Sequence, residues 1–432
     1  MSKPVQTPPF WYQLLLAIIV PLYRLRVWQR SKLQPDYQAE VVERFQIAQT
    51  VKNQQVIWIH AVSVGETNAA QPIIEHFLAQ GQAVLVTNTT RTGQARVKAL
   101  FAQNYPDLFE AVFLPVDTVG LMQQFLQRYQ PRLFILIETE LWPNALSLTA
   151  QANIPSILIN ARLSERSAKG YAKFSRLTRP MLTQLSCIAA QDSATAQRFM
   201  ALGADKNNVV VTGSVKFDIQ PPEFLVQQAK QLKQDWQLHG RPILVAASTH
   251  DPEEADIVAQ FKTVLVQYPN AVLIVVPRHP ERFASVAQLI KTNGFDLFQR
   301  SQQHVIQPKT QVYLADSMGE LWLWYALADM AFVGGSLSSN GGHNPLEPVA
   351  LGVPVVMGEH TFNFQAIVEQ LTQAGALQQV ESSQQVMQVW LNWLQQPELA
   401  KQAGVAGLQV MQANQGALGK QVGLITQLFN ST

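Results

Sequence analysis

Short apolar runs alternate with amphipathic segments over most of the 432-residue chain. The apolar runs predict buried strands, and apolar residues that recur every three or four positions predict helices between them, for example over Gly93–Phe101 and Gly120–Tyr129. The strands expected in the first half are Val56–Val62, Ala83–Thr87, Ala111–Leu114, Leu133–Ile137, Ser156–Asn160, Cys187–Ala190 and Val209–Val211. This alternation predicts a parallel sheet with helices on both faces.

A second alternation follows a probable linker, in which Gly213–Asp218 precedes Pro221 and Pro222. The strands expected there are Ile243–Ala247, Ala271–Val276, Gln311–Leu314, Met330–Val333 and Val353–Met357. We therefore expect an α/β fold with two Rossmann-like domains, residues 36–217 and 218–432, that face each other across a cleft, a preferred place for ligands. The last helix, near Gly416–Phe429, is free to pack on either domain.

Residues 1–35 are expected to form a separate membrane-associated segment. Its apolar run, Phe10 to Tyr23, is shorter than the roughly 20 apolar residues of a spanning helix. Aromatic residues lie at both ends of the run, and four basic residues follow it: Arg24, Arg26, Arg30 and Lys32. This pattern favours a short helix at the interface, where anionic lipid headgroups attract the cations. A buried helix packed on its own domain is the alternative.

Composition and missing motifs exclude several classes of protein. The net charge of +2 provides no overall field for nucleic acid, which we do not expect as a partner. Cys187 is the only cysteine, so an intramolecular disulfide and a cysteine-based zinc site are excluded. No GxGxxG follows the first strand and no GxxxxGK[ST] is present, which argues against a dehydrogenase and a P-loop enzyme.

Glu66 lies where the first strand passes into a helix, within Val56–Phe77. In open α/β sheets this strand end is where ligands bind. Gly65 before it would allow a tight turn, and helix-terminal N–H groups would lie nearby. Glu66 is therefore a candidate for chemistry, whereas capping of the helix is the alternative.

Other strand ends also carry polar residues. Glu138 and Glu140 flank one threonine, so on a continuing strand both would face one side and suit acid–base work. Alternatively, Glu140 begins a helix while Glu138 pairs with a cation. Arg278 and Arg282 form a basic loop around His279, which suits either phosphate recognition or surface ion pairs.

The glycine-rich segment Phe332–Pro348 is the most informative motif of the second half. Its turn would leave backbone N–H groups free to cradle phosphate. A helix expected from Pro345 would present its N-terminus to an anion, and Glu347 in its first turn would accept hydrogen bonds from a ribose. This pattern is typical of the nucleotide-binding half of two-domain glycosyltransferases.

Nine motifs together resemble one family. They are SVGET (63–67), ETELWPN (138–144), NARLSERS (160–167), GSVKFD (213–218), STHDPEE (248–254), PRHPERF (277–283), DSMGEL (316–321), GGSL (334–337) and GGHNPLEP (341–348). The chain resembles the 3-deoxy-D-manno-octulosonic acid (Kdo) transferases of Gram-negative bacteria over nearly its whole length. The resemblance implies a GT-B fold and transfer of Kdo from CMP-Kdo to the lipid A precursor lipid IVA. It also places the enzyme at the cytoplasmic face of the inner membrane, in contact with anionic lipid.

The resemblance implies a role for particular residues. Glu66 corresponds to the general base of an inverting transfer, and Glu138 and Lys216 to residues that support the transition state. The residues that correspond to the CMP site are Pro277, Arg278, Met318, Gly319, Glu320, Asn344, Pro345, Leu346 and Glu347. We expect neither a metal nor a cofactor. For the donor carboxylate we expect Arg91 or Lys216, and Ser63 and Gly65 are further candidates for donor or acceptor contacts.

Two other functions remain open at this point. One is another GT-B enzyme that uses a UDP-sugar, either as a transferase or as an epimerase. The other is a two-lobed sugar-binding membrane protein without catalysis. The number of Kdo residues added to each acceptor is not apparent from these motifs.

Overall fold

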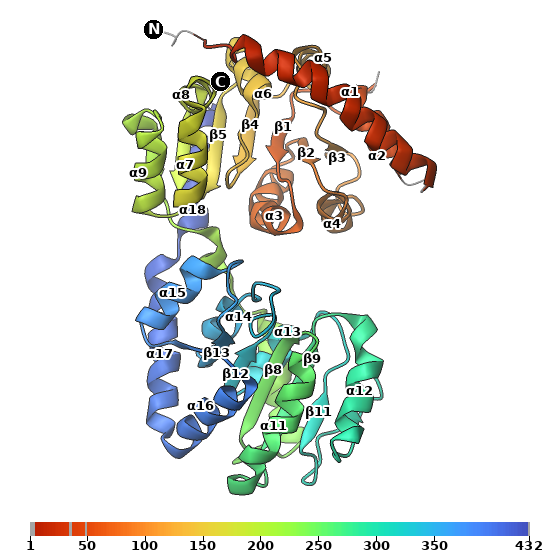
Figure 1. Cartoon of the computed structure of the whole chain (residues 1–432), viewed down its shortest axis with the longest axis vertical. Coiled ribbons are helices and arrows are strands. Elements are labelled where there is room, and N and C mark those ends of the chain that lie inside the picture. The colour runs from red at the N-terminus through yellow and green to blue at the C-terminus, as the bar shows by residue number, and fades with distance from the viewer. Residues whose placement is uncertain (1–4, 34–36, 48–49, 431–432) are drawn as a thin grey trace. The chain divides into compact units, whose positions relative to one another are not determined.

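The computed structural model describes residues 5–33, 37–47 and 50–430, and the chain divides into two compact units (Figure 1). The N-unit comprises Met1–Lys216 together with Gln415–Thr432, and the C-unit comprises Phe217–Asn414. The C-unit begins one residue earlier than the expected boundary. The last helix, which the sequence left free to pack on either domain, belongs to the N-unit. A short 3-10 helix, η2 (Val215–Asp218), contains the junction.

The N-unit contains a parallel sheet of seven strands in the order β3-β2-β1-β4-β5-β6-β7. Its strands are β1 (Ile57–His60), β2 (Val84–Asn88), β3 (Phe109–Phe113), β4 (Leu133–Ile137), β5 (Ser156–Ala161), β6 (Cys187–Ala190) and β7 (Val209–Val211). Each matches a strand expected from the sequence. Every residue of β1, β2 and β4 is buried, as expected for strands covered on both faces.

Helices lie on both faces of this sheet (Figure 1). They are α3 (Val64–Ala79), α4 (Arg91–Phe101), α5 (Val119–Tyr129), α6 (Pro143–Gln151), α7 (Glu165–Lys173), α8 (Ser175–Gln184), α9 (Ser193–Ala201) and α18 (Ala417–Asn430). The last helix, α18, packs on the N-unit: Ile425 is fully buried in an apolar cluster with Ile73 and Ile135. The Gln421 side-chain amide also donates to the Thr212 hydroxyl at 3.1 Å.

Two N-terminal helices, α1 (Phe10–Leu33) and α2 (Tyr37–Phe45), also belong to the N-unit. The Tyr12 hydroxyl donates to Asp117 at 2.9 Å, and Glu43 of α2 accepts from the Phe113 N–H at 2.7 Å. Helix α1 continues through the basic residues and is therefore longer than the apolar run Phe10–Tyr23. By length and composition alone it is sufficient to cross a membrane, which corrects the expectation that the segment is too short.

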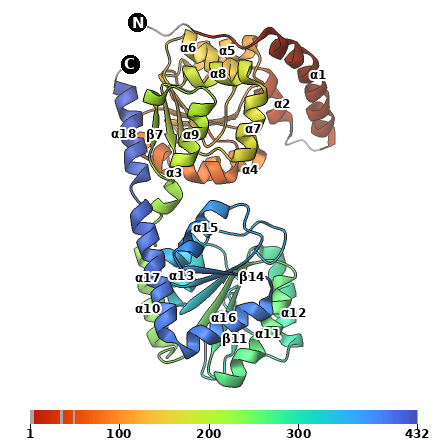
Figure 2. The same cartoon turned by 60° about the vertical axis from the view of Figure 1, so that its left-hand side comes forward.

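The C-unit repeats the architecture, with strands in the order β10-β11-β9-β8-β12-β13-β14, all parallel (Figure 2). Its strands are β8 (Ile243–Thr249), β9 (Val272–Pro277), β10 (Phe298–Gln299), β11 (Val312–Leu314), β12 (Met330–Val333), β13 (Val355–Gly358) and β14 (Leu377–Val380). Its helices are α10 (Glu223–Asp235), α11 (Glu253–Gln267), α12 (Phe283–Thr292), α13 (Leu321–Leu327), α14 (Leu346–Ala350), α15 (Gln365–Gln373), α16 (Ser383–Gln395) and α17 (Pro397–Asn414). The edge strands β10 and β14 were not expected.

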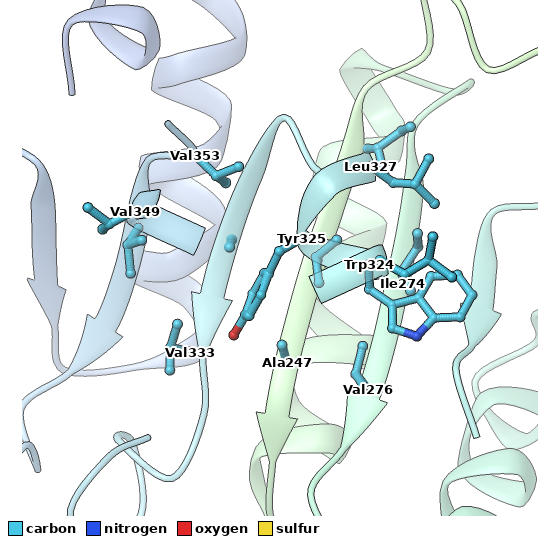
Figure 3. Close-up of a cluster of buried hydrophobic side chains, with 14 of the residues drawn as sticks. Ala247, Ile274, Val276, Trp324, Tyr325, Leu327, Val333, Val349 and Val353 are labelled. Carbon is cyan, nitrogen blue, oxygen red and sulfur yellow. The ribbon is translucent and has the colours of Figure 1, made fainter. Parts of the chain in front are cut away.

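The C-unit core is built around the aromatic side chains of α13 (Figure 3). Trp324 and Tyr325 are almost completely buried, in one cluster with Val276 of β9 and Val333 of β12. Fully burying one such side chain stabilises a fold by about 1.5–3 kcal/mol. This packing fixes the ends of β9 and β12 relative to each other.

Both sheets reverse their strand order beside their first strand. In the N-unit the reversal lies between β1 and β4, and in the C-unit between β8 and β12. In doubly wound sheets, ligands bind at the carboxyl ends of the strands at such a reversal. The residues that follow these four strands are therefore the first place to look for a site in each unit.

Candidate active site

Glu66 follows β1 and lies in the first turn of α3, where it forms a capping box with Ser63. The Ser63 hydroxyl accepts from the Glu66 N–H at 3.4 Å, and Glu66 Oε2 accepts from the N–H groups of Val62 and Ser63. Glu66 thus caps the helix, which was the structural alternative to a chemical role. Within the described part of the chain, Oε1 has no hydrogen-bond partner, so the same carboxylate still has an oxygen for a substrate.

Burial, together with the negative charges of Glu140 and Glu138, raises the pKa of Glu66 to about 7. The two backbone hydrogen bonds act in the opposite direction but are outweighed. A carboxylate that titrates near neutral pH holds and releases a proton under working conditions, which is what a general base requires.

Glu138 lies in the left-handed region of the backbone, with φ of 62°, immediately after β4. The strand therefore ends at Ile137, and α6 begins only at Pro143. The strand does not continue through Glu138 and Glu140, and no helix starts at Glu140, so neither of the two expected local structures is formed. A left-handed backbone at a residue other than glycine costs of the order of 1 kcal/mol and is often found at functional sites.

Lys216 adds a cation to this carboxylate group. Burial lowers the pKa of Lys216, whereas the charge of Glu138 raises it and that of Arg162 lowers it. Burial also raises the pKa of Glu140, and the charge of Glu138 adds to the rise. The structure thus places Glu66, Glu138 and Lys216 in one electrostatic neighbourhood of the N-unit, at the reversal between β1 and β4.

Arg91 and Gly65 differ from their expected settings. Arg91 Nε lies 3.6 Å from Glu40 Oε2, so its guanidinium has a carboxylate partner on α2. Gly65 lies inside α3 and has no left-handed backbone, so a tight turn does not explain it. A Cβ added there would meet only Ser63 Oγ, at 3.8 Å. The absent side chain leaves the surface beside Glu66 open.

In the C-unit the two arginines after β9 have different environments. Arg282 forms ion pairs with Asp251 at 3.1 Å and with the completely buried Glu254 at 3.2 Å. Arg278 is exposed, and its positive charge lowers the pKa of both His343 and Glu347. Arg278 is therefore the arginine available to a ligand, whereas Arg282 holds the loop. Pro277 is the buried last residue of β9.

Three histidines from separate strand ends meet beside Arg278. His250 Nε2 lies 2.7 Å from His343 Nε2, and the rings of His250 and His279 are 5.2 Å apart. Burial, together with the positive charge of Arg278, lowers the pKa of His343 to about 4. The His250–His343 pair is therefore neutral near pH 7, with one ring donating and the other accepting.

The remaining expected nucleotide residues follow β11 and β12. Met318 is 55% exposed, and Gly319 has φ of +84°. The Glu320 carboxylate is already bound by Arg300 through two nitrogens and by the Ser317 hydroxyl. The backbone at this turn and the Met318 side chain are therefore the groups that remain for a ligand.

Asn344 and Glu347 form a connected pair after β12. The Asn344 amide donates to Glu347 at 3.3 Å and accepts from the Leu346 N–H at 3.1 Å. Burial raises the pKa of Glu347 to about 7. Helix α14 begins at Leu346 rather than at Pro345 and has only five residues, so its dipole is weaker than the expected helix would provide.

Three consecutive N–H groups of the glycine-rich turn, which we expected to be free for phosphate, are instead occupied by the protein. The N–H groups of Gly335, Ser336 and Leu337 all donate to the carboxylate of Glu253. Among the residues that the structure describes, no three His, Cys, Asp or Glu side chains are grouped to hold a metal ion.

A family model described as 3-deoxy-D-manno-octulosonic-acid transferase (kdotransferase) matches residues 39–219. The 3-deoxy-D-manno-octulosonic acid transferase of Haemophilus influenzae is 39% identical over 421 residues, which cover 96% of this chain and 97% of that protein. The chain belongs to the Kdo transferase family. It is therefore a glycosyltransferase of lipopolysaccharide biosynthesis, which rules out the non-catalytic sugar-binding alternative.

Solved structures confirm the fold of this Kdo transferase. A glycosyltransferase of Rickettsia africae matches with a TM-score of 0.54 at 14% identity, covering 88% of this chain and all of that one. A UDP-GlcNAc 2-epimerase of Neisseria meningitidis matches with a TM-score of 0.56 at 12% identity. The match covers 87% of this chain and 100% of that one. At such low identity the likeness concerns the fold alone, which is GT-B, as expected.

Sequence reasoning about the Kdo transferase missed three partners of the candidate residues. Glu40 pairs with Arg91, Arg300 binds Glu320, and Glu253 fills the glycine-rich turn. Glu253 lies in the STHDPEE motif, so the family resemblance was a signal for it. Glu40 and Arg300 lie outside the nine motifs and carried no such signal.

Proposed function

We propose that this Kdo transferase moves Kdo from CMP-Kdo to lipid IVA, with inversion and without a metal ion. The observation that carries the proposal is Glu66: its pKa is raised to about 7 and Oε1 has no partner among the described residues. A base poised near the working pH suits the removal of a proton from an acceptor hydroxyl. The N-unit would bind the acceptor and the C-unit the donor.

In the proposed reaction, Glu66 Oε1 takes the proton of the acceptor hydroxyl while that oxygen attacks the anomeric carbon of Kdo. The bond from this carbon to the phosphate oxygen breaks on the opposite face, and CMP leaves with the electron pair. Negative charge then grows on the phosphate, which Arg278 of the C-unit would offset. In the N-unit, Lys216 is the cation proposed to support the transition state. Glu138 supports Lys216, because its charge favours the protonated amine.

The C-unit residues suggest how the nucleotide is held. Glu347, the backbone at Met318–Glu320 and the Asn344 amide would bind the cytidine, beside Pro277 and Arg278. For the Kdo carboxylate we retain both Arg91 and Lys216 as candidates. Arg91 would have to share its contact with Glu40, whereas Lys216 lies close enough to Glu138 for the charge of that carboxylate to raise its pKa. Ser63 and Gly65 border the same surface.

A direct test is transfer of labelled Kdo from CMP-Kdo to lipid IVA by the full-length protein. We expect turnover with chelator present, inhibition by CMP, and little inhibition by UMP or UDP at the same concentration. Equal inhibition by UDP would instead support a UDP-sugar enzyme of the same fold. An inverted anomeric configuration of the product would support the single displacement, and a retained one would exclude it.

We further propose that α1 lies in the interface of the inner membrane on its cytoplasmic face. Tyr12 near its start bonds to Asp117, and Tyr23 packs its ring 5.8 Å from that of Phe45 on α2. A helix attached to the N-unit at both places runs along it (Figure 1). Its outer side chains remain exposed, among them Ile18 at 66% and Leu22 at 63%.

Exchanging Ile18 and Leu22 together for glutamate is expected to weaken binding to vesicles of anionic phospholipid about tenfold or more, because each apolar side chain contributes about 1.5–3 kcal/mol when buried. Activity on acceptor in detergent should remain. The matched control is Val266→Glu, an 83% exposed position on α11 of the C-unit. Vesicle binding by the double variant as strong as that of the control would contradict the interfacial role of α1.

A further inference from the structure

Glu253, in the first turn of α11, is 1% exposed and accepts four backbone hydrogen bonds. Oε2 accepts from the N–H groups of His250 at 3.0 Å and Gly335 at 2.7 Å. Oε1 accepts from those of Ser336 at 3.0 Å and Leu337 at 2.9 Å. One buried carboxylate therefore joins the ends of β8 and β12, the two strands at the reversal of the C-unit sheet.

Consecutive N–H groups that point to one spot form an anion-binding nest. Gly335 provides the required backbone with φ of +68°. At Gly334, an added Cβ would lie 2.6 Å from the Ser248 carbonyl oxygen and 2.9 Å from Glu253 Oε2. The two glycines thus make room for a carboxylate of the protein itself, so that these N–H groups are not open to a ligand.

The nest fixes the start of the loop that leads to the proposed nucleotide residues. The loop returns to the nest where Gly342 N–H donates to the Gly335 carbonyl at 2.7 Å and His343 N–H donates to that of Gly334 at 3.2 Å. The His250–His343 contact at 2.7 Å joins the same two strand ends through side chains. Asn344 to Glu347 follow directly, so their positions depend on this arrangement.

We propose that Glu253 is a built-in anion that fills the nest of the glycine-rich loop and positions the loop for the cytidine nucleotide. The nucleotide phosphate then binds outside these N–H groups, next to exposed Arg278. Glu253 is a positioning residue, since its carboxylate is enclosed by the protein and acts through Gly335 to Leu337. The inference rests on the proposed donor CMP-Kdo.

The test compares CMP affinity and donor KM for Glu253→Ala and the wild type, using the full-length protein. We expect both constants to rise about tenfold or more, since misplacing a binding group by about 1 Å costs up to about 10²-fold. The acceptor KM should hardly change. Added formate should restore CMP affinity in Glu253→Ala, because it can occupy the vacated nest, and should have no effect on the wild type.

Two further variants keep the test decisive. Glu253→Gln preserves size but introduces an N–H₂ that opposes the donors of the nest, so it should weaken CMP binding without rescue by formate. Asp256→Asn removes a charge from the same first turn at an exposed side chain and should leave the donor constants unchanged. Amide hydrogen exchange at residues 335–337 should rise in both Glu253 variants and not in Asp256→Asn.

Lower thermal stability with unchanged CMP affinity in both Glu253 variants would overturn the positioning role. Tighter CMP binding by Glu253→Ala would also overturn it, because the phosphate would then be entering a nest that Glu253 normally blocks. Failure of the wild type to bind CMP is a different result, which would reject the proposed donor. Wild-type binding with unaffected variants would reject only the role of Glu253.

Discussion

Glu66→Gln is expected to lower Kdo transfer by about 10²-fold or more while CMP affinity and thermal stability stay close to those of the wild type. Glutamine preserves the capping box, because its amide oxygen can still accept from the N–H groups of Val62 and Ser63. It cannot take a proton from the acceptor. The measurement is the single-turnover rate of transfer from CMP-Kdo, together with a CMP titration and a melting curve.

The matched control is Glu75→Gln, an exposed glutamate of the same helix whose side chain accepts from Gln71. It should transfer Kdo at the wild-type rate. If Glu66→Gln also retained that rate, Glu66 would be a helix cap alone. If Glu66→Gln unfolded enough of the protein to account for the lost activity, a catalytic role for Glu66 would likewise not be needed.

The same residue predicts a pH dependence. Wild-type transfer should rise with pH through about 7, where Glu66 loses its proton. Glu140→Gln should move this rise to lower pH. Of the two neighbouring carboxylates, Glu140 has the larger effect in raising the pKa of Glu66, and the substitution removes its charge. Since the native pKa lies above the usual 4.5, the native state binds the proton more tightly, and the contribution of Glu66 to stability declines as pH increases from about 4.5 to 7.

Arg278→Ala is expected to raise the KM for CMP-Kdo about 10- to 100-fold, the equivalent of about 1.5–3 kcal/mol for hydrogen bonds from a charged group to phosphate. Thermal stability should hardly change, because Arg278 is exposed. Donor KM and CMP affinity, measured by initial rates and calorimetry, are the two readouts. Arg278→Lys should recover part of the loss, since lysine keeps the charge without the planar fork of donors.

Arg282→Ala, four residues along the same loop, should have the reverse effect. It leaves buried Glu254 without its cation, so we expect unfolding to become easier by about 1–3 kcal/mol with a smaller change in donor KM. If Arg282→Ala affected donor binding more than Arg278→Ala, the division of the loop into a ligand-facing and a structural arginine would be wrong.

Strands were the part of the fold most open to prediction, because continuous apolar runs such as Leu133–Ile137 have few alternatives to a buried parallel strand. The polar residues that follow those runs then indicated which edge of the sheet carries Glu66 and Glu138. Glu66 follows β1 and Glu138 follows β4, the two neighbouring strands at which the strand order reverses. Short edge strands such as β10, with two residues, have too little pattern to detect.

Contacts between distant parts of the chain were beyond sequence reasoning. Nothing local indicates that Glu253 accepts from Gly335, or that His250 reaches His343. The glycine-rich turn was expected to cradle a phosphate, but three of its N–H groups bind a carboxylate of the protein itself. The left-handed backbone of Glu138 was equally hidden, because the surrounding fold imposes it against the local preference of a glutamate.

The return of the chain to the N-unit has a consequence for biosynthesis. Helix α18 contributes Ile425 to the N-unit core, yet it is synthesised only after the whole C-unit. The N-unit therefore lacks part of its core until the C-unit and α18 have been made, although most of its sequence is made first. During that interval, the apolar surface that α18 later covers is open to chaperones or to other nascent chains. A truncation that removed α18 would leave the N-unit in this unfinished state permanently.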